Sequence, residues 1–329
     1  MAVHFSNIIP PAWNWIAPPE LIEIFQLEQP KNFAALMFAL TGQESHAYFN
    51  KPVTSQSMVG IFAGEVKRQW DSGSSIMLGS EEVDWVVNDQ LDGPAILSKV
   101  LSILPPGYKA FTTVVINYRA PRINHLLSLW KEVGVVKQQT FYQFVFDPAT
   151  ILQLHAFDPL PLVKVFLERG LKVKLIDLSG VAKQELKSYQ ILACDIMEVP
   201  CDANKNPVFV EERIKTRPDI MKLLTKDFNV RVNGELNVTD GQLGQIAEQL
   251  QLYDCNFKNL ASHQHLTVLY DHDFGANMKK CPHNNTPMSQ RELWKHIMMI
   301  TDSFRVRDVD AESLFLPGGL FDISGDDLT

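Results

Sequence analysis

The residues with the clearest potential for chemistry are carboxylates that follow apolar, β-branched runs. In open α/β sheets, ligands bind outside the carboxyl ends of the strands, so acidic residues at those ends are candidates for nucleotide binding. The structural alternative is that such carboxylates cap the loops that follow the strands. The four carboxylates at or near such ends are Asp177, Asp195, Asp271 and Asp273.

The elements that must position these carboxylates alternate between strand and helix. Pro159 and Pro161 open a helix that Gly170 closes, the usual asymmetry of helix ends, and Thr239-x-x-Gln242 predicts a capped helix start. The apolar run 33–40 is compatible with a strand or a helix. Strands are predicted at 74–78, 82–88, 110–117, 140–146, 151–156, 171–177, 191–197 and 265–270. Further helices are predicted at 55–70, 94–104, 123–133 and 290–300.

This alternation predicts an α/β protein with mostly parallel, Rossmann-like sheets flanked by helices, in two domains or halves. The length of 329 residues suits two domains. We expect an N-terminal α/β domain at 1–149, opened by a proline- and tryptophan-rich arm at 1–19. We expect a C-terminal Rossmann-like domain at 150–329, with a hairpin insertion at 229–239 and an apolar-acidic tail at 314–329.

Composition restricts the classes of partner. The formal net charge of −8 does not indicate a protein that coats nucleic acid. No apolar run is long enough to span a membrane, and the N-terminus lacks the pattern of a signal peptide. The spacing of the four cysteines matches no CxxC pair or disulfide framework, which predicts free thiols in a reducing, cytoplasmic compartment.

The segments 166–177 and 191–200 resemble the helix and successive strands of class I, Rossmann-like methyltransferases. The resemblance implies that Asp177 binds the ribose hydroxyls of S-adenosylmethionine and that Asp195 binds its adenine amine. It also implies that the strand 266–273 carries catalytic polar residues, among them Asp271 and Asp273.

One departure from that family concerns the glycine-rich turn that holds the cofactor. The turn should follow the strand 151–156, but the sequence there is Phe157-Asp-Pro-Leu-Pro161, with no glycine before Gly170. Glycines let backbone approach a cofactor, and prolines remove the N–H donors it needs. The sequence therefore favours a scaffold that keeps the fold without the cofactor.

Short segments of the sequence resemble two other enzyme families more weakly. Gln90-Leu-Asp-Gly-Pro-Ala95, between a strand and a helix, is similar to the pyrophosphate loop of GNAT acyltransferases. Asp254 with Asn259, followed by Asp273-Phe-Gly275, resembles the catalytic loop and magnesium motif of protein kinases, without the His-Arg that should precede Asp254. Both remain open as alternatives.

A metal site is a further alternative, because five of the nine histidines lie between residues 263 and 296. Imidazole, thiolate and carboxylate are proper zinc ligands, although the spacing here fits no known closed site. Ordinary surface histidines are the competing interpretation. The candidate ligands are His263, His265, His272, Cys281 and His283.

Aromatic and apolar residues near both ends of the chain point to protein partners. Trp13 and Trp15 lie in the proline-rich arm, and Leu316 and Phe321 lie in the tail. Extended proline-aromatic segments suit grooves on partner proteins, although the arm can equally pack on its own domain. The sequence thus predicts a non-catalytic subunit or adaptor of a protein assembly. The alternative is an S-adenosylmethionine-dependent methyltransferase, and whether the protein is an enzyme stays undecided.

Overall fold

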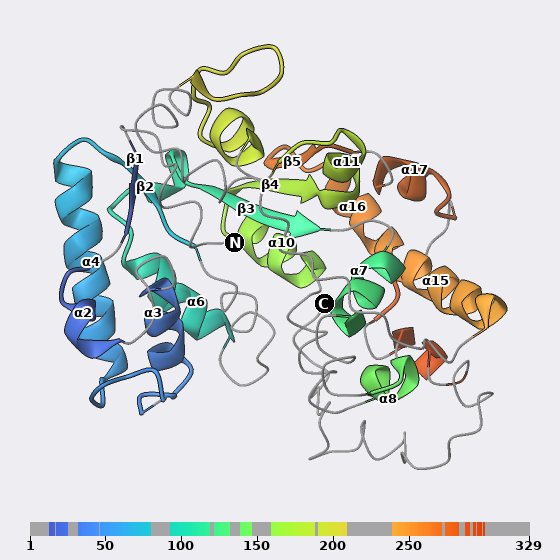
Figure 1. The fold of residues 1–329 in the computed structure, drawn as a ribbon, viewed down its shortest axis with the longest axis horizontal. Helices are drawn as coiled ribbons and strands as arrows, with labels where there is room; N and C mark the ends of the chain where they lie inside the picture. Colours follow the sequence, from blue (N-terminus) through green and yellow to red (C-terminus); the bar gives the residue numbers. More distant parts are fainter. Residues whose placement is uncertain are drawn as a thin grey trace. The chain divides into compact units, whose positions relative to one another are not determined.

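The computed structural model describes most of the chain (Figure 1). The described residues are 13–25, 32–79, 93–118, 122–131, 139–146, 159–208, 239–271, 274–282 and 287–299, except 17, 46, 188, 189, 290, 291, 294 and 298, and some are described by backbone alone. The predicted strands 82–88 and 151–156, most of the hairpin 229–239 and the tail 314–329 lie outside this part of the chain.

The chain divides into two compact units, each of which is discontinuous in sequence. Unit 1 comprises residues 1–112 and 185–228, and unit 2 comprises residues 113–184 and 229–329. This division differs from the predicted one, because the expected boundary at 149/150 falls inside unit 2. Neither unit can therefore be read as one continuous stretch of the chain.

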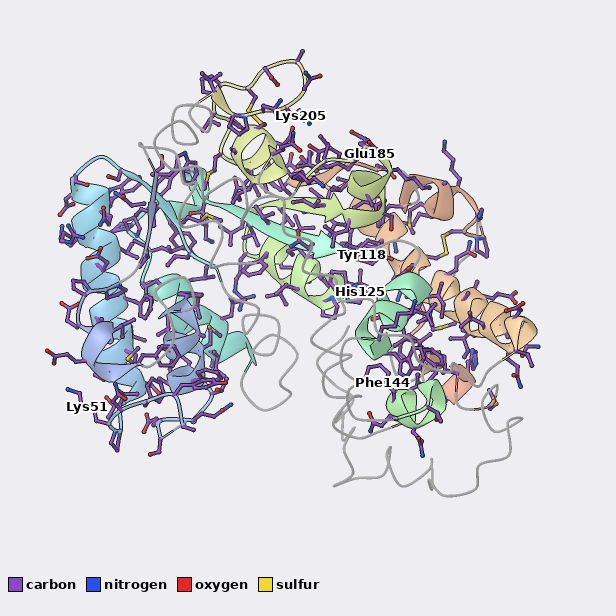
Figure 2. The ribbon with its side chains drawn as sticks, in the orientation of Figure 1. Lys51, Tyr118, His125, Phe144, Glu185 and Lys205 are labelled. Atoms are coloured by element: carbon purple, nitrogen blue, oxygen red, sulfur yellow. A yellow bond between two sulfur atoms is a disulfide. The ribbon has the colours of Figure 1, made fainter. Side chains whose placement is uncertain are left out.

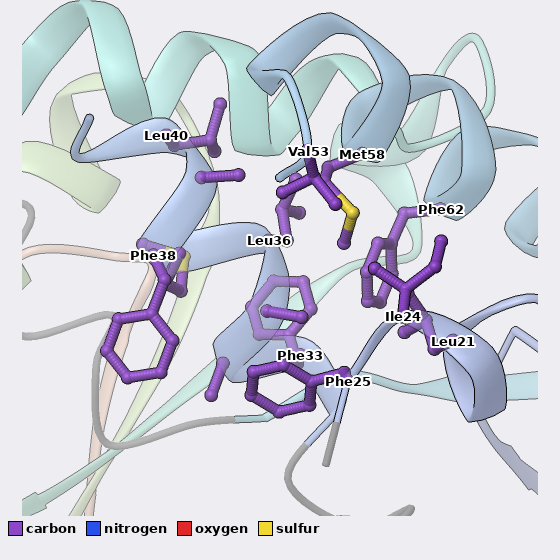
Figure 3. Close-up of a cluster of buried hydrophobic side chains, with 14 of the residues drawn as sticks. Leu21, Ile24, Phe25, Phe33, Leu36, Phe38, Leu40, Val53, Met58 and Phe62 are labelled. Carbon is purple, nitrogen blue, oxygen red and sulfur yellow. The ribbon is translucent and has the colours of Figure 1, made fainter. Parts of the chain in front are cut away.

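Unit 1 has a helical core. The ambiguous run 33–40 is helical, in α3 (Asn32–Leu40), and every described side chain of that helix is buried. It packs against α4 (Ser55–Asp71), whose start is fixed by a capping box at Thr54. Figure 3 shows the resulting cluster, to which α2 (Leu21–Ile24) also contributes. A helix buried all round shows no amphipathic period, which is why sequence periodicity left it undecided.

A small parallel sheet lies beside this helical core. Strand β1 (Trp13–Trp15) pairs with β2 (Ser75–Met77), which confirms the predicted strand at 74–78. The side-chain amide of Asn14 donates to Gln69 of α4 at 2.6 Å. Helix α6 (Gly93–Ser102) confirms the predicted helix at 94–104 and is followed by the short 3-10 helix η2 (Tyr108–Ala110).

In the last described segment of unit 1, residues 185–208, one predicted element is wrong. The expected strand 191–197 is a π-helical turn, η4 (Ile191–Ile196). A short apolar run cannot be distinguished from a buried helix by period alone. Gln190 holds the turn, because its side-chain oxygen accepts from the backbone N–H of Lys187 and its amide donates to Asn204 and Asn206.

Unit 2 contains a three-stranded, all-parallel sheet in the order β3-β4-β5. Strands β3 (Thr113–Tyr118), β4 (Lys172–Asp177) and β5 (Leu266–Leu269) confirm three predicted strands. Helix α10 (Pro159–Glu168) confirms the predicted proline-opened helix and packs against β3 and β4. Its apolar side chains, among them Leu162, Val163 and Phe166, are buried.

The other helices of unit 2 are mostly short. Helix α15 (Asp240–Asp254) begins at the predicted capping box, in which Thr239 and Gln242 satisfy each other's backbone N–H groups. It packs against α7 (Arg122–Leu129), which confirms the predicted helix at 123–133. Among the described residues, unit 2 also has α8 (Phe141–Phe146), α11 (Leu178–Lys183), η5 (Cys255–Phe257), α16 (Lys258–Ala261) and α17 (Phe274–Lys279).

Helix α8 overturns a second predicted strand, at 140–146. A capping box starts it, since the N–H of Gln143 donates to the Thr140 hydroxyl at 3.1 Å and Gln143 accepts from the N–H of Thr140 at 2.9 Å. Phe141, Phe144 and Val145 are buried at helical spacing, and Figure 2 labels Phe144 on this helix. The Thr-x-x-Gln pattern was the sequence signal for this helix, and the alternating aromatics obscured it.

The fold class is thus confirmed as α/β, with small parallel sheets and flanking helices. This is compatible with a Rossmann-like arrangement. Within the part of the chain that the structure describes, no helix has the length and apolar character needed to cross a membrane.

Candidate functional site

The carboxyl edge of the three-stranded sheet is where a ligand of an α/β protein would bind. The register of β3 and β4 places Tyr118 opposite Asp177, the last residue of each strand. Strand β5 ends beside them and continues into Tyr270 and Asp271. Figure 2 labels Tyr118 at this end of β3. Of the sequence-predicted site residues, this edge therefore gathers Asp177 and Asp271.

Asp177 is fully buried, with none of its surface exposed. Its carboxylate is the N-cap of α11 and accepts hydrogen bonds from the backbone N–H groups of Ser179, at 2.9 Å, and Gly180, at 3.4 Å. These donors would otherwise be unpaired at the helix start. The Asp177 carboxylate, at the end of β4, thus lies inside the protein. The hydrogen bonds described for it stabilise the start of α11.

The backbone beyond Asp177 lies directly against the turn that follows β5. A Cβ built on Gly180 would overlap the carbonyl oxygen of Tyr270. Tyr270 itself adopts a left-handed conformation, with φ of 61°, that few non-glycine residues adopt. Helix α11 and the turn after β5 are therefore in direct backbone contact, which only a glycine at position 180 permits.

Asp271 is exposed, but it too has a structural partner. Its carboxylate accepts a hydrogen bond from the backbone N–H of Gly275 in the first turn of α17. Asp273, the second predicted catalytic carboxylate, lies outside the described residues. Of the pair predicted to be catalytic, the structure therefore places only Asp271, at a helix start.

A buried tyrosine–aspartate pair lies at the same edge and was not predicted as a site. The Tyr118 hydroxyl donates a hydrogen bond to Oδ2 of Asp254 at 2.5 Å. Both residues are almost completely buried. The rings of Phe257 and Phe274 pack around Tyr118 with centroids 5.8 and 5.9 Å from it. The two partners are 136 residues apart, so no local pattern could reveal the pair. The kinase-like interpretation gave Asp254 a catalytic role, but here it accepts a hydrogen bond inside the core.

Asp195 lies in the other compact unit. It belongs to η4 rather than to a strand, and its carboxylate forms an ion pair with Lys205 at 2.7 Å. The methyltransferase resemblance requires Asp177 and Asp195 to end neighbouring parallel strands. The described sheet instead has Tyr118 and Leu269 at the ends of the strands beside β4.

The prediction of free thiols is wrong, because all four cysteines are paired in disulfides. Disulfides join Cys194 to Cys201 in unit 1 and Cys255 to Cys281 in unit 2. The inference of a reducing compartment therefore loses its basis, since disulfides persist mainly in oxidising surroundings. Sequence spacing could not show the pairing, because the partners are 7 and 26 residues apart in unrelated patterns.

The loop after Cys201 is held by one carboxylate. Asp202 accepts hydrogen bonds from the backbone N–H groups of Asn206 and Asn204, at 2.7 and 2.8 Å, and from the Asn206 amide at 3.0 Å. These hydrogen bonds, with that of the Asn206 backbone the largest contribution, lower the pKa of Asp202. The disulfide and this turn together stabilise a polar loop.

The predicted metal ligands are only partly brought together. His263 and His265 lie in the turn before β5, with their ring centroids 5.7 Å apart. The backbone N–H of His265 donates a hydrogen bond to Nδ1 of His263. Cys281 is bonded to Cys255 and has no thiolate to offer. His272 and His283 lie outside the described residues. Within the described ranges, no cluster of three or more histidine, cysteine or acidic residues could hold a metal ion.

The predicted partner-binding residues are placed in part. Trp13 is half-buried in β1, and of Trp15 only the backbone is described. Leu316 and Phe321 lie outside the described residues. The described aromatic pair that stands out at the surface is instead Trp70, at the end of α4, stacked on Phe111 with centroids 4.5 Å apart. Their exposed fractions are 42% and 47%.

Comparison of the chain with protein-family models, with curated proteins and with solved structures found no match in any of the three. The class of the protein therefore rests on its own architecture, an α/β chain whose parallel sheet has a carboxyl edge occupied by its own side chains.

Proposed function

We propose that this protein is a non-catalytic subunit or adaptor of a larger protein assembly, built on a Rossmann-like scaffold that has lost its cofactor site. The observation that carries the proposal is the state of Asp177. The carboxylate that a nucleotide-binding relative would present to ribose hydroxyls is completely buried and caps α11. A group that must bind a ligand needs an open position toward it.

The neighbouring groups support the same conclusion. Tyr118 and Asp254 are buried and bonded to each other, and Gly180 lies against the Tyr270 backbone. Asp177, Tyr118 and Asp254 thus each have a hydrogen-bond partner within the protein. Polar groups that satisfy one another inside a core specify a fold, whereas catalytic groups must reach a substrate.

The exposed aromatic pair of unit 1 supports protein binding. Tryptophan is enriched among the residues that dominate interface energies, and large aromatic surfaces are seldom left in water without a function. Arg68, two residues before Trp70, has 64% of its side chain exposed. Arginine is a second residue type typical of such interfaces.

The test is affinity purification of the full chain under native conditions, with mass spectrometry of both proteins and small molecules. We expect a stoichiometric protein partner and no bound nucleotide. Trp70→Ala with Phe111→Ala should lower recovery of that partner by about tenfold, the effect of losing about 1.4 kcal/mol. Met299→Ala, which removes another exposed apolar side chain, should leave recovery unchanged. A monomeric protein that retains a nucleotide would contradict the proposal.

The second candidate function is an S-adenosylmethionine-dependent methyltransferase. The observation in its favour is that Asp177 ends a parallel strand, as the resemblance requires. Calorimetric titration with S-adenosylmethionine and with its demethylated product tests it. Heat of binding that disappears in Asp177→Ala, in a variant that remains folded, would support this candidate over the adaptor. Absence of binding would remove it.

A further inference from the structure

The two disulfides of the protein lie in different surroundings. Cys255 and Cys281 are only 2% and 6% exposed, whereas Cys194 and Cys201 are both half-buried. A reductant must bring a thiolate to one of the sulfurs, so burial protects a disulfide from reduction. Cys194 and Cys201 are also closer in sequence, with a separation of 7 against 26, and a short loop gains less stability from the bond. The Cys194–Cys201 bond is therefore the more reducible of the two.

The backbone around this disulfide is irregular. Cys194 belongs to the π-helical turn η4, and π-helical turns are rare and frequent at functional sites. Glu198, between the two cysteines, has a left-handed conformation with φ of 55°, which is unfavourable for a residue with a side chain. The disulfide is one of the constraints that hold this conformation, so opening it lets the segment relax. Disulfides in strained segments are the labile ones.

The reduced form has a hydrogen-bond acceptor already in place. The Sγ of Cys194 lies 3.3 Å from the carbonyl oxygen of Lys205, a residue that Figure 2 labels. A disulfide sulfur carries no hydrogen, so this contact is not a hydrogen bond in the oxidised protein. A thiol at Cys194 is a donor and would form one with the same oxygen. Reduction therefore adds an interaction that the oxidised form lacks.

Other contacts hold the same two segments together without the sulfurs. Asp195 of η4 forms an ion pair with Lys205 at 2.7 Å. Gln190, the residue before η4, donates to the carbonyl oxygen of Asn204 at 3.2 Å and to the side-chain oxygen of Asn206 at 3.1 Å. After reduction these contacts would keep the two thiols near each other. The disulfide would then re-form readily, because closely held reactants combine faster than free ones.

From these contacts we infer that Cys194 and Cys201 form a reversible redox switch, which a dithiol reductant opens while the Cys255–Cys281 bond stays intact. A thiolate of the reductant attacks one sulfur, forms a mixed disulfide and releases the other cysteine. The second thiol of the reductant then breaks the mixed disulfide. Two electrons and two protons thus pass to the protein, which gains two thiols, and the reductant leaves as its own disulfide. The switch controls the covalent link between η4 and the loop that follows Cys201, and it is independent of the proposed function.

The experiment measures the reduction of each disulfide in the full chain. The oxidised protein is equilibrated in buffers with increasing ratios of reduced to oxidised dithiothreitol, and thiols are blocked with iodoacetamide. The remaining disulfides are then reduced and labelled with N-ethylmaleimide, and mass spectrometry of peptides counts both labels. The Cys194–Cys201 bond should be half-reduced at a ratio at least about tenfold lower than the Cys255–Cys281 bond, which corresponds to about 30 mV for a two-electron couple.

Two further measurements test the switch in the folded protein. At the ratio that opens only Cys194–Cys201, circular dichroism should be unchanged. Hydrogen exchange followed by mass spectrometry should then be faster in the segment 194–206 and unchanged in α15, which contains neither cysteine. Removal of the reductant should restore both the disulfide and the slower exchange.

A charge variant tests whether the non-covalent contacts keep the thiols together. Asp195→Asn removes the ion pair with Lys205 and should slow re-formation of the disulfide about two- to fivefold, the range expected for a pair near the surface. Asp240→Asn, the same change at an exposed position of α15, is the control and should leave the rate unchanged. Cys194→Ser with Cys201→Ser should abolish the change in hydrogen exchange.

Several results would overturn the inference. One is half-reduction of the two disulfides at the same ratio of dithiothreitol forms. Another is loss of the circular dichroism signal at the ratio that opens Cys194–Cys201, since the bond would then be needed for the fold. Failure of the folded, reduced protein to re-form the bond would contradict reversibility. Isolation of the protein with thiols at both positions that no ratio oxidises would remove the disulfide itself.

Discussion

Both compact units bury carboxylates, and they satisfy them in different ways. In unit 1, Glu65 receives two hydrogen bonds from the guanidinium of Arg68, at 2.6 and 2.7 Å, and Arg68 itself is exposed. In unit 2, Asp177 is bonded to backbone N–H groups, and Asp254 is bonded to the neutral hydroxyl of Tyr118.

This difference shows how each unit depends on its surroundings. A carboxylate that reaches an exposed cation is sensitive to pH and salt, and its contribution to stability is modest. A carboxylate held by uncharged donors inside the protein depends on the geometry of those donors, and losing one leaves a polar group buried without its partner. We therefore expect unit 2 to tolerate substitution at its polar core less well than unit 1.

The largest expected effects come from removing the disulfides, and the two disulfides should differ in how much stability is lost. Serine replacement of both Cys255 and Cys281 opens a loop with a sequence separation of 26, whereas replacement of Cys194 and Cys201 opens one of 7. In the chain-entropy description these losses are about 3.5 and about 2.4 kcal/mol. Urea unfolding followed by circular dichroism should rank the variants in this order. A larger loss for the Cys194 and Cys201 variant would reverse the comparison.

The next prediction concerns Gly180. Replacing a helical glycine with alanine ordinarily stabilises a protein by up to about 1 kcal/mol. Gly180→Ala should instead destabilise by about 1 to 3 kcal/mol, because its Cβ would overlap the Tyr270 carbonyl oxygen. Gly244→Ala in α15 is the control, since a Cβ there meets nothing within 4 Å. Thermal unfolding should give shifts of opposite sign, and equal shifts would show that the Gly180 site relaxes freely.

Tyr118→Phe tests the buried pair directly. It removes the donor to Asp254 while keeping the ring between Phe257 and Phe274. Hydrogen bonds to charged groups contribute about 1.5 to 3 kcal/mol, so we expect a loss near 2 kcal/mol. A double-mutant cycle with Asp254→Asn should show coupling of about 1 kcal/mol. Additive losses would mean that the two side chains do not stabilise each other.

The smallest effect is expected at Glu65 and depends on pH. Burial raises the pKa of Glu65, but hydrogen bonds from Arg68 and Gln69 and the charge of Arg68 outweigh it and hold the pKa below its ordinary value. A folded pKa below that of the unfolded chain, about 4.3, gives stability that is complete above that pH and is lost as the pH falls through the folded pKa.

Glu65→Gln should therefore cost up to about 1 kcal/mol at neutral pH, and its difference from the wild type should disappear below the folded pKa. Unfolding curves at a series of pH values measure this. Glu248→Gln, an exposed position on α15, is the control and should change little. A difference that persists in acid would show that the carboxylate acts through packing rather than charge.

Much of the fold was predictable because local patterns agree with the tertiary structure. The β-branched runs of β3, β4 and β5 were predicted as strands, and the capping box at Thr239 predicted the start of α15. The failures at α8 and η4 have one cause. In both, aromatic or apolar residues fit a strand and a helix equally well, and the decisive contacts are side-chain caps and the disulfide at Cys194.

The candidate site was less predictable. Asp177 was identified as a strand-end carboxylate, and its position was confirmed, but a sequence cannot show whether such a group faces a ligand or a helix start. Asp195 was placed on a strand that does not form. The surface feature that carries the proposed function, the Trp70 and Phe111 stack, depends on which neighbours leave these two rings exposed.

By itself the sequence determined the class of architecture, since the alternation of β-branched runs, proline-opened helices and capping boxes depends only on neighbouring residues and their intrinsic geometry. The tertiary structure alone decided which polar groups are enclosed, because burial is set by elements distant in the chain. The bond from Tyr118 to Asp254 crosses 136 positions, and the Gly180 backbone meets a turn that follows another strand. Because of those long-range contacts, residues that resemble a binding site in the sequence form hydrogen bonds that stabilise the fold.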